Sequence, residues 1–118
     1  MPAAPLDTHE LVVLSLLTEG PLYGYAIAQR AAARSSGDVN LTPGVLYPLL
    51  KRLEKSGLIL GEWDEVKSDR AEEDAPGRRR KWYRMTPKGA KRLDAQADAH
   101  RAHAKMVEAF LPATEGRP

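Results

Sequence analysis

The chain has 118 residues, which corresponds to one domain, and its 42% of hydrophobic and 29% of charged residues are ordinary for a globular protein. It contains no cysteine, which excludes disulfides, thiolate metal ligands and a cysteine nucleophile. The formal net charge is +2, yet residues 78–92 hold eight basic and no acidic side chains, which indicates either an anionic partner or a solvated basic surface.

The first predicted helix contains the longest apolar stretch, Leu11 to Leu17, which is too short to span a membrane. Asp7 followed three residues later by Glu10 forms a capping-box pattern at its start, and Gly20-Pro21 ends it. No secretory signal is recognisable, so we expect a cytoplasmic protein without a membrane partner. A second helix is predicted from about Tyr23 to Arg34.

The third predicted helix has clear signals at both ends. Thr42 is a good N-cap, Pro43 suits the first helical position, and Gly57 suits the residue after the C-cap. Pro48 lies inside the helix, where we expect it to distort or tighten the first turn. A spacing of about 100° per residue places the hydrophobic side chains on one face and four other residues on the opposite face. The hydrophobic face holds Val45, Leu46, Leu49, Leu50 and Leu53. The opposite face holds Gly44, Tyr47, Lys51 and Lys55.

Two extended runs follow, 58–66 and 80–85, and both contain residues that favour strands. The polar segment 67–77 between them ends in Pro-Gly and is predicted to be the tip of a hairpin. The tip carries Glu72, Glu73 and Asp74, which an anionic partner would repel, so we expect it to be mobile and to point away from such a partner.

Thr86-Pro87 predicts the start of a long last helix, 87–111, and 112–118 is expected to be a disordered tail. Residues on one stripe of this helix alternate at spacings of three and four, which is typical of a coiled-coil seam. Pairing with a second copy of the chain would cover it, although a helix that folds back on its own domain remains an alternative. The residues expected at the dimer interface are Leu11, Leu14, Leu93, Ala97, His100, Ala104, Met106, Val107, Phe110 and Leu111.

The order of helix, helix, capped helix, hairpin and helix predicts a mainly α fold with a small β-hairpin. This is the arrangement of a winged helix-turn-helix domain over residues 1–86, with the wing at about 58–85 and the dimerisation helix after it. In a helix-turn-helix, the helix after the turn enters the major groove of DNA, and a basic wing contacts the backbone or the adjacent minor groove.

Three segments resemble the PadR family of transcriptional regulators. They are Gly20-Pro21-Leu22-Tyr23-Gly24-Tyr25, the run from Leu41 to Ile59 with Leu46-Tyr47-Pro48-Leu49-Leu50 at its centre, and the run from Arg79 to Gly89. The single C-terminal helix is similar to that of the smaller subgroup of the family.

The resemblance implies a homodimeric repressor that binds double-stranded DNA at a palindromic operator and responds to an unidentified small-molecule effector. By position it places Tyr47 and Lys51 at the DNA and Tyr23 near the backbone. Together with the charge pattern, it gives the full set of expected DNA-binding residues. They are Tyr23, Thr42, Pro43, Gly44, Tyr47, Lys51, Arg52, Lys55, Arg78, Arg79, Arg80 and Lys81.

Two other classes of protein remain as alternatives. An enzyme is disfavoured because the chain has no glycine-rich phosphate loop and only three histidines, so we expect no catalytic residue and no cofactor. His100 and His103 are three residues apart on a helix, but they fall on different stripes without a convergent carboxylate, so we expect no metal. The second alternative is a winged-helix module that contacts only proteins and shows no salt-dependent DNA affinity.

Overall fold

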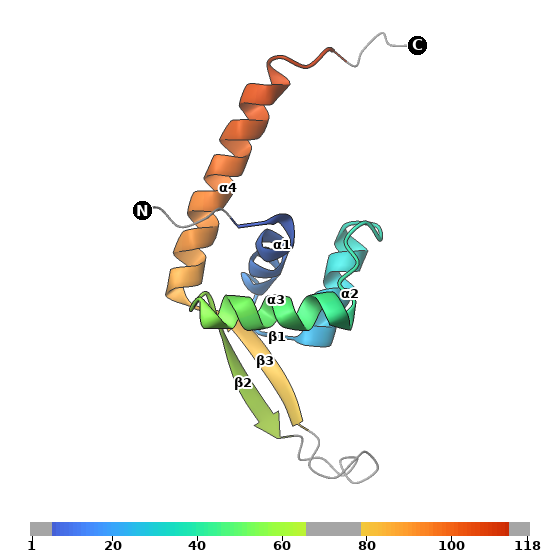
Figure 1. Ribbon diagram of the computed structural model, residues 1–118, viewed down its shortest axis with the longest axis vertical. Helices are drawn as coiled ribbons and strands as arrows, with labels where there is room; N and C mark the ends of the chain where they lie inside the picture. The colour runs from blue at the N-terminus through green and yellow to red at the C-terminus, as the bar shows by residue number, and fades with distance from the viewer. Residues whose placement is uncertain (1–5, 66–78, 114–118) are drawn as a thin grey trace.

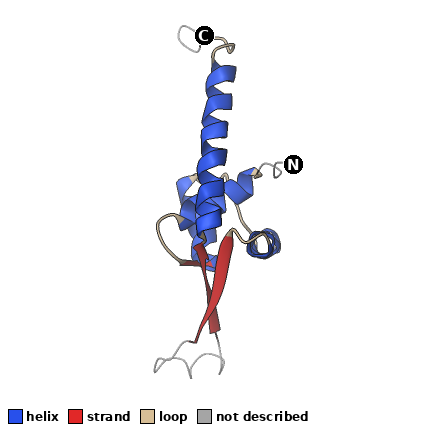
Figure 2. Cartoon of the chain, turned by 90° about the vertical axis from the view of Figure 1, so that its left-hand side faces the viewer, coloured by secondary structure: helices blue, strands red, loops and turns tan. Residues whose placement is uncertain are grey.

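The computed structural model describes residues 6–65 and 79–113 (Figure 1). Within these residues, helices α1, α2 and α3 and a three-stranded sheet surround one core, and α4 and the β2–β3 hairpin leave it in opposite directions (Figure 2). The prediction of a mainly helical winged fold is confirmed. The elements are α1 (Thr8–Leu17), β1 (Leu22–Tyr23), α2 (Gly24–Arg34), α3 (Pro43–Lys55), β2 (Ile59–Glu65), β3 (Arg79–Met85) and α4 (Pro87–Glu108).

The start of α1 is the predicted capping box. The Asp7 side chain accepts a hydrogen bond from the Glu10 amide at 2.8 Å, and the Glu10 carboxylate accepts one from the Asp7 amide at 3.0 Å. These two bonds satisfy donors that the first turn of a helix cannot satisfy itself. The sequence signal and the local structure therefore agree here.

Helix α3 keeps its predicted ends and contains Pro48 without interruption. The amides of Val45 and Leu46 both donate to the Thr42 carbonyl, at 2.9 and 2.7 Å, so the first turn is tightened as expected. At the other end Gly57 has a φ of 78°, and the Leu58 amide donates to the Leu53 carbonyl at 3.0 Å. This is a Schellman closure, which needs a residue that tolerates positive φ after the C-cap.

The sheet has the strand order β1-β3-β2, and both pairs are antiparallel. The hairpin ladder runs from Ile59 opposite Met85 to Glu65 opposite Arg79. The short strand β1 pairs Tyr23 with Trp82, so α2 begins one residue later than the sequence indicated and Tyr23 is its N-cap. Sequence analysis missed β1 because two residues are too few for an alternating pattern.

The core corrects two expectations. Val45 is 40% exposed, because it lies about 100° around the helix from Leu46 and therefore on the flank of α3. Leu14, which was expected at the dimer interface, has no exposed surface and packs inside its own protomer. The fully buried large side chains are Leu14, Ile27, Leu49, Leu50, Leu53, Ile59 and Val13.

Helix α4 begins as predicted, because the Thr86 hydroxyl accepts a hydrogen bond from the Gly89 amide at 3.0 Å. Its first turns pack on α1 through Leu93, which is 8% exposed. From Asp98 to Glu108 every side chain except Val107 is exposed. The helix ends at Glu108 rather than at about Leu111, since Pro112 disfavours the helical conformation of the residue before it.

Candidate nucleic-acid interface

The outer face of α3 presents one aromatic and two cationic side chains beside an open backbone. Tyr47 is 49% exposed, and Lys51 and Lys55 follow it along the helix on the exposed side. Gly44 is exposed, and a Cβ built on it would meet nothing within 4 Å. This face therefore offers hydrogen-bond donors and positive charge on a helix that nothing else in the described residues covers.

The two flanks of α3 are tied to other elements by ion pairs. On one flank Arg52 lies 3.8 Å from the Asp7 carboxylate and 3.9 Å from the Glu10 carboxylate, at the start of α1. On the other flank Glu54 lies 3.0 Å from the ammonium group of Lys81, on β3. The four buried leucines of α3 set its rotation about its axis, and the ion pairs add to this on the two flanks, so the outer face keeps its direction.

The Lys81–Glu54 pair is the more protected of the two, with side chains only 25% and 29% exposed. The Lys81 ammonium also lies 5.4 Å from the centre of the Trp63 ring and 5.5 Å from that of Tyr83. The pair passes over β2 at Gly61, where a Cβ would overlap the Lys81 side chain and lie 2.8 Å from a Glu54 oxygen. A glycine in the strand thus leaves room for the pair that joins the wing to α3.

An aromatic hollow of about 650 Å³ lies between the start of α2, the outer face of α3 and the hairpin. Tyr25 is 71% exposed and Trp63 is 58% exposed at its edge. Its lining includes no carboxylate and contains five of the seven aromatic residues of the chain. The lining residues are Tyr23, Gly24, Tyr25, Tyr47, Trp63, Arg80, Lys81 and Tyr83.

One wall of this aromatic hollow is a stack built on β1 and β3. The rings of Tyr23 and Trp82 have centroids 3.6 Å apart, and the Arg80 guanidinium lies 5.0 Å from the centre of the Tyr23 ring. The Trp82 indole donates a hydrogen bond to Asp64 at 3.0 Å. Stacking and hydrogen bonding therefore hold Arg80 beside the outer face of α3.

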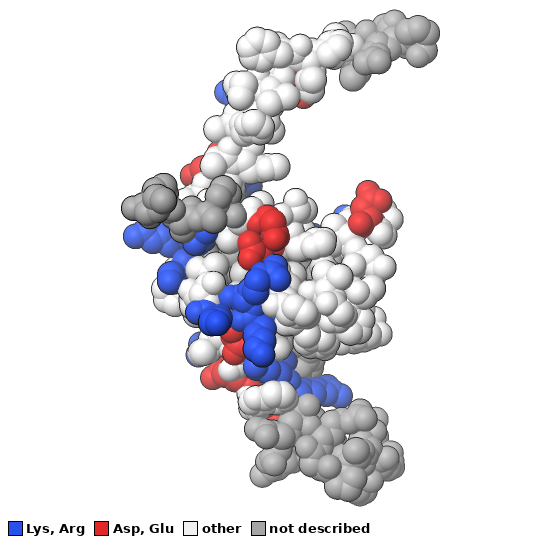
Figure 3. Space-filling view, in the orientation of Figure 1, with Lys and Arg blue, Asp and Glu red and all other residues white. Residues whose placement is uncertain are grey.

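Figure 3 shows the cations gathered where the C-terminal part of α3, the start of α4 and the hairpin meet. Arg84 is paired with Glu62 at 3.4 Å. Among the described residues, Lys51, Lys55 and Lys91 have no acidic partner within 4.0 Å. An unbalanced positive surface beside aromatic rings is suited to a polyanion whose backbone carries phosphate and whose bases carry π-faces.

Comparison with known proteins identifies the family. Residues 13–95, which include α2, α3, both hairpin strands and the start of α4, match the profile of the transcriptional regulator PadR-like family. The chain belongs to the PadR-like family of transcriptional regulators.

Solved structures of PadR-like regulators have the same fold. A PadR family transcription regulator from hypervirulent Clostridium difficile R20291 is 28% identical, with a TM-score of 0.73 over 90% of this chain and 100% of its own. A PadR family transcriptional regulator from Eggerthella lenta DSM 2243 is 32% identical, with a TM-score of 0.68 over 90% of this chain and 84% of its own. An uncharacterized protein of Lysinibacillus sphaericus is 26% identical over 104 residues, 88% of each chain.

The residues that the sequence assigned to DNA fall into three groups in this PadR-like regulator. The outer face and first turn of α3 hold Thr42, Pro43, Gly44, Tyr47, Lys51 and Lys55, all exposed. The aromatic hollow holds Tyr23, Arg80 and Lys81, of which Lys81 is also paired with Glu54, and Arg52 lies beside the carboxylates of Asp7 and Glu10. For Arg79 only its strand position is described, and Arg78 and the acidic tip lie outside the described residues.

Sequence analysis missed Tyr25 and Trp63, which complete the edge of the aromatic hollow. A signal for Tyr25 was present, because it follows Tyr23 across a single glycine at the start of α2. Gly24 lets the Tyr47 ring approach the start of α2 closely, since a Cβ there would lie 3.1 Å from the Tyr47 hydroxyl oxygen. Trp63 gave no signal in the sequence, because its neighbours come from a distant strand.

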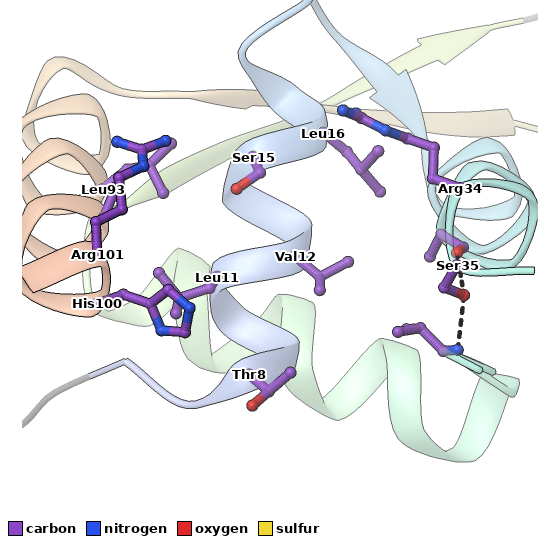
Figure 4. Close-up of a pocket in the computed structure, with 13 residues that line it drawn as sticks. Thr8, Leu11, Val12, Ser15, Leu16, Arg34, Ser35, Leu93, His100 and Arg101 are labelled. Atoms are coloured by element: carbon purple, nitrogen blue, oxygen red, sulfur yellow. Dashed lines mark hydrogen bonds between the residues drawn. The ribbon is translucent and has the colours of Figure 1, made fainter. Parts of the chain in front are cut away.

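A second hollow, an apolar groove of about 420 Å³, lies between α1, α4 and the end of α2. Figure 4 shows α1 along its floor, with Leu93, His100 and Arg101 of α4 on one side and Arg34 on the other. Further along α4, Met106 is 52% exposed, and Phe110, just after the end of the helix, is 81% exposed. The PadR-like chain thus carries both an open apolar groove and exposed apolar side chains on the helix beside it.

Neither metal binding nor membrane insertion has support in the described part of the chain. No group of three His, Cys, Asp or Glu side chains is arranged there to hold a metal ion. His100 lies in the apolar groove, and His103 is exposed. No described helix is long and apolar enough to cross a membrane.

Tyr83 should make stability depend on pH in the alkaline range. Burial raises the pKa of its phenol, and Glu54 and Tyr47 add to the rise because they disfavour a nearby negative charge. The unfolded chain therefore releases this proton at lower pH than the folded chain, and stability is lost as pH rises above about 10. The free energy of unfolding, measured in urea at pH 8 to 11, should fall less steeply with pH for Tyr83→Phe than for the wild type. Tyr25→Phe, whose ring is 71% exposed, should keep the wild-type slope.

Proposed function

We propose that the chain is a sequence-specific DNA-binding repressor that binds a palindromic operator as a homodimer. The observation that carries the proposal is the exposed outer face of α3, with Tyr47, Lys51 and Lys55, beside the aromatic hollow and Arg80. A helix of this kind fits the major groove, and Arg80 would then meet the phosphate backbone. A protein that occupies operator DNA excludes other proteins from it, so binding at a promoter would repress transcription.

The homodimer is proposed from the surfaces of α4. Ala97, His100, Ala104 and Val107 form one stripe of exposed and half-buried side chains along α4, and a second copy of the chain offers the same stripe. The end of the partner's α4, with exposed Met106 and, just after the helix, exposed Phe110, matches the apolar groove in chemistry. A two-fold axis would make this contact reciprocal and place the two α3 helices at inverted half-sites, which is why we propose a palindrome.

Release from DNA by an effector is part of the same proposal. A ligand shifts a protein between two arrangements only by its difference in affinity for them. A small molecule that binds where the two chains meet at the apolar groove would act on the spacing of the α3 helices, and hence on operator affinity.

The test measures fluorescence anisotropy on duplexes tiled across the DNA upstream of the gene, with a shuffled duplex for comparison, over a salt series. We expect one tile to bind more tightly than the shuffled duplex, with an affinity that falls steeply with salt. Lys51→Ala should weaken binding to that tile at least about 10-fold and reduce the slope of log affinity against log salt by about 1.8, because the dimer loses one phosphate contact in each half-site. Tyr47→Ala should reduce the preference for that tile.

Lys105→Ala is the matched control, since it removes the same charge from an exposed site near the end of α4. Equal losses of DNA affinity for the two lysine variants would show that only the total charge matters. That result would contradict the proposal that the outer face of α3 contacts the DNA. Absence of binding to any duplex at low salt would instead favour a module that contacts proteins.

A further inference from the structure

Three successive backbone carbonyls just after α3 are all bonded by residues at the start of α4. The Ser56 carbonyl accepts from the Lys88 ammonium at 2.9 Å, and the Gly57 carbonyl accepts from the Thr86 hydroxyl at 2.6 Å. The Leu58 carbonyl accepts from the Thr86 amide at 3.1 Å. Groups at a helix end lack partners within the helix, and here another helix supplies them. Figure 1 shows the two helices meeting at this point.

A single oxygen atom closes both helices. The Thr86 hydroxyl donates to the Gly57 carbonyl and also accepts from the Gly89 amide at 3.0 Å, which caps α4. Serine can make both bonds, whereas valine has the same shape and can make neither. This difference provides a pair of variants that separate the hydroxyl from the size of the side chain.

Gly89 brings the backbones of the two elements into direct contact. A Cβ at this position would overlap the carbonyl oxygen of Leu58 and lie 2.8 Å from Cγ of Met85. A backbone carbonyl cannot turn aside as the end of a long side chain can. Alanine at position 89 would therefore force α4 away from the turn between α3 and β2.

We propose that Thr86 and Gly89 are positioning residues that join α3 and α4 into one rigid body. The inference rests on the function proposed above, in which α4 pairs the two chains and α3 reads the DNA. Two α3 helices can match a fixed half-site spacing only if the angle between α3 and α4 is fixed in each chain. The junction thus sets the distance between half-sites that the dimer accepts, without touching a base.

The first arm of the test measures the distance between α3 and α4 in the absence of DNA. The chain has no cysteine, so spin labels can be placed through Val45→Cys on α3 and Asp98→Cys on α4, both exposed. Labelled chains are diluted with unlabelled chains so that distances within one chain dominate. We expect a narrow distance distribution in the otherwise wild-type and Thr86→Ser proteins. Thr86→Val should broaden it, and Gly89→Ala should shift its mean.

The second arm measures affinity for the preferred duplex and for versions with one or two base pairs added between the half-sites. The wild type and Thr86→Ser should discriminate strongly between these spacings. Thr86→Val should reduce the ratio of affinities by about fivefold or more, because it removes two hydrogen bonds and one typically contributes about a factor of five. Sedimentation must show the same oligomeric state for all the proteins, so that a change in the affinity ratio can be assigned to the junction.

A distribution in Thr86→Val as narrow as in the wild type would overturn the proposal. So would an equal loss of affinity for every spacing, because that is the result of a merely destabilised protein. If the wild type prefers no duplex, the proposed function fails, and the spin-label distances still decide whether the junction is rigid.

Discussion

The Ala104→Glu variant is expected to sediment as a single chain at micromolar concentrations at which the wild type sediments as a pair. Ala104 is exposed on the α4 stripe that we propose to pair, so the substitution leaves the folded protomer intact. In a dimer with closely packed helices it would bury a carboxylate without a partner, which costs about 3 kcal/mol or more. The dissociation constant should therefore rise by at least about 100-fold.

Lys105→Glu is the control for this prediction. Lys105 is also exposed, but its side chain lies about 100° around the helix both from Ala104 and from Met106. It should pair as the wild type does and bind the preferred duplex equally well, whereas Ala104→Glu should lose most of its affinity because it presents one α3 helix. Identical sedimentation of the two variants would mean that the stripe is not the pairing surface.

Leu14→Ala should lower the free energy of unfolding by about 2–5 kcal/mol. Leu14 has no exposed surface and packs among the side chains of the core. Truncation there removes apolar contacts and leaves a cavity that the surrounding helices close only in part. The measurement is urea unfolding, with every variant at the same protein concentration because association contributes to stability.

Leu60→Ala makes the same chemical change on β2, where the leucine is 42% exposed. It should cost less than about 1 kcal/mol, because a large part of the removed surface is already in water and truncation there leaves no enclosed cavity. A decrease in the free energy of unfolding as small for Leu14→Ala as for Leu60→Ala would show that Leu14 is not a core residue. It would also reopen the sequence-based assignment of Leu14 to the dimer interface.

Local signals in the sequence predicted the helix boundaries well. The Asp7–Glu10 capping box, the Thr42-Pro43 start, Gly57 and the Thr86-Pro87 start all act within a few residues of one another. Their physical causes are unsatisfied backbone groups and allowed φ values, which depend on near neighbours. The element order that follows from them was enough to indicate a winged helix-turn-helix.

Partners distant in the chain could not be predicted in the same way. Arg52 and Lys81 were grouped with the free cations, because the sequence does not show that they lie beside the carboxylates of Glu10 and Glu54. Lys81 and Glu54 are 27 residues apart, and only the strand register brings them together. The cations that remain without such partners, Lys51 above all, are therefore better candidates for DNA than charge alone indicated.

The base of the hairpin has a consequence for how this chain can change in evolution. Ile59 lies opposite Met85, and the Thr86 amide is bonded to the Leu58 carbonyl. The start of β2 and the end of β3 are therefore held together where the hairpin joins the rest of the domain. Insertions or deletions between Glu65 and Arg79 act at the far end of the ladder, and each doubling of a loop costs only about 0.6 kcal/mol in closure entropy. A change of length there, or a grafted peptide, should therefore leave α3 and α4 in their positions.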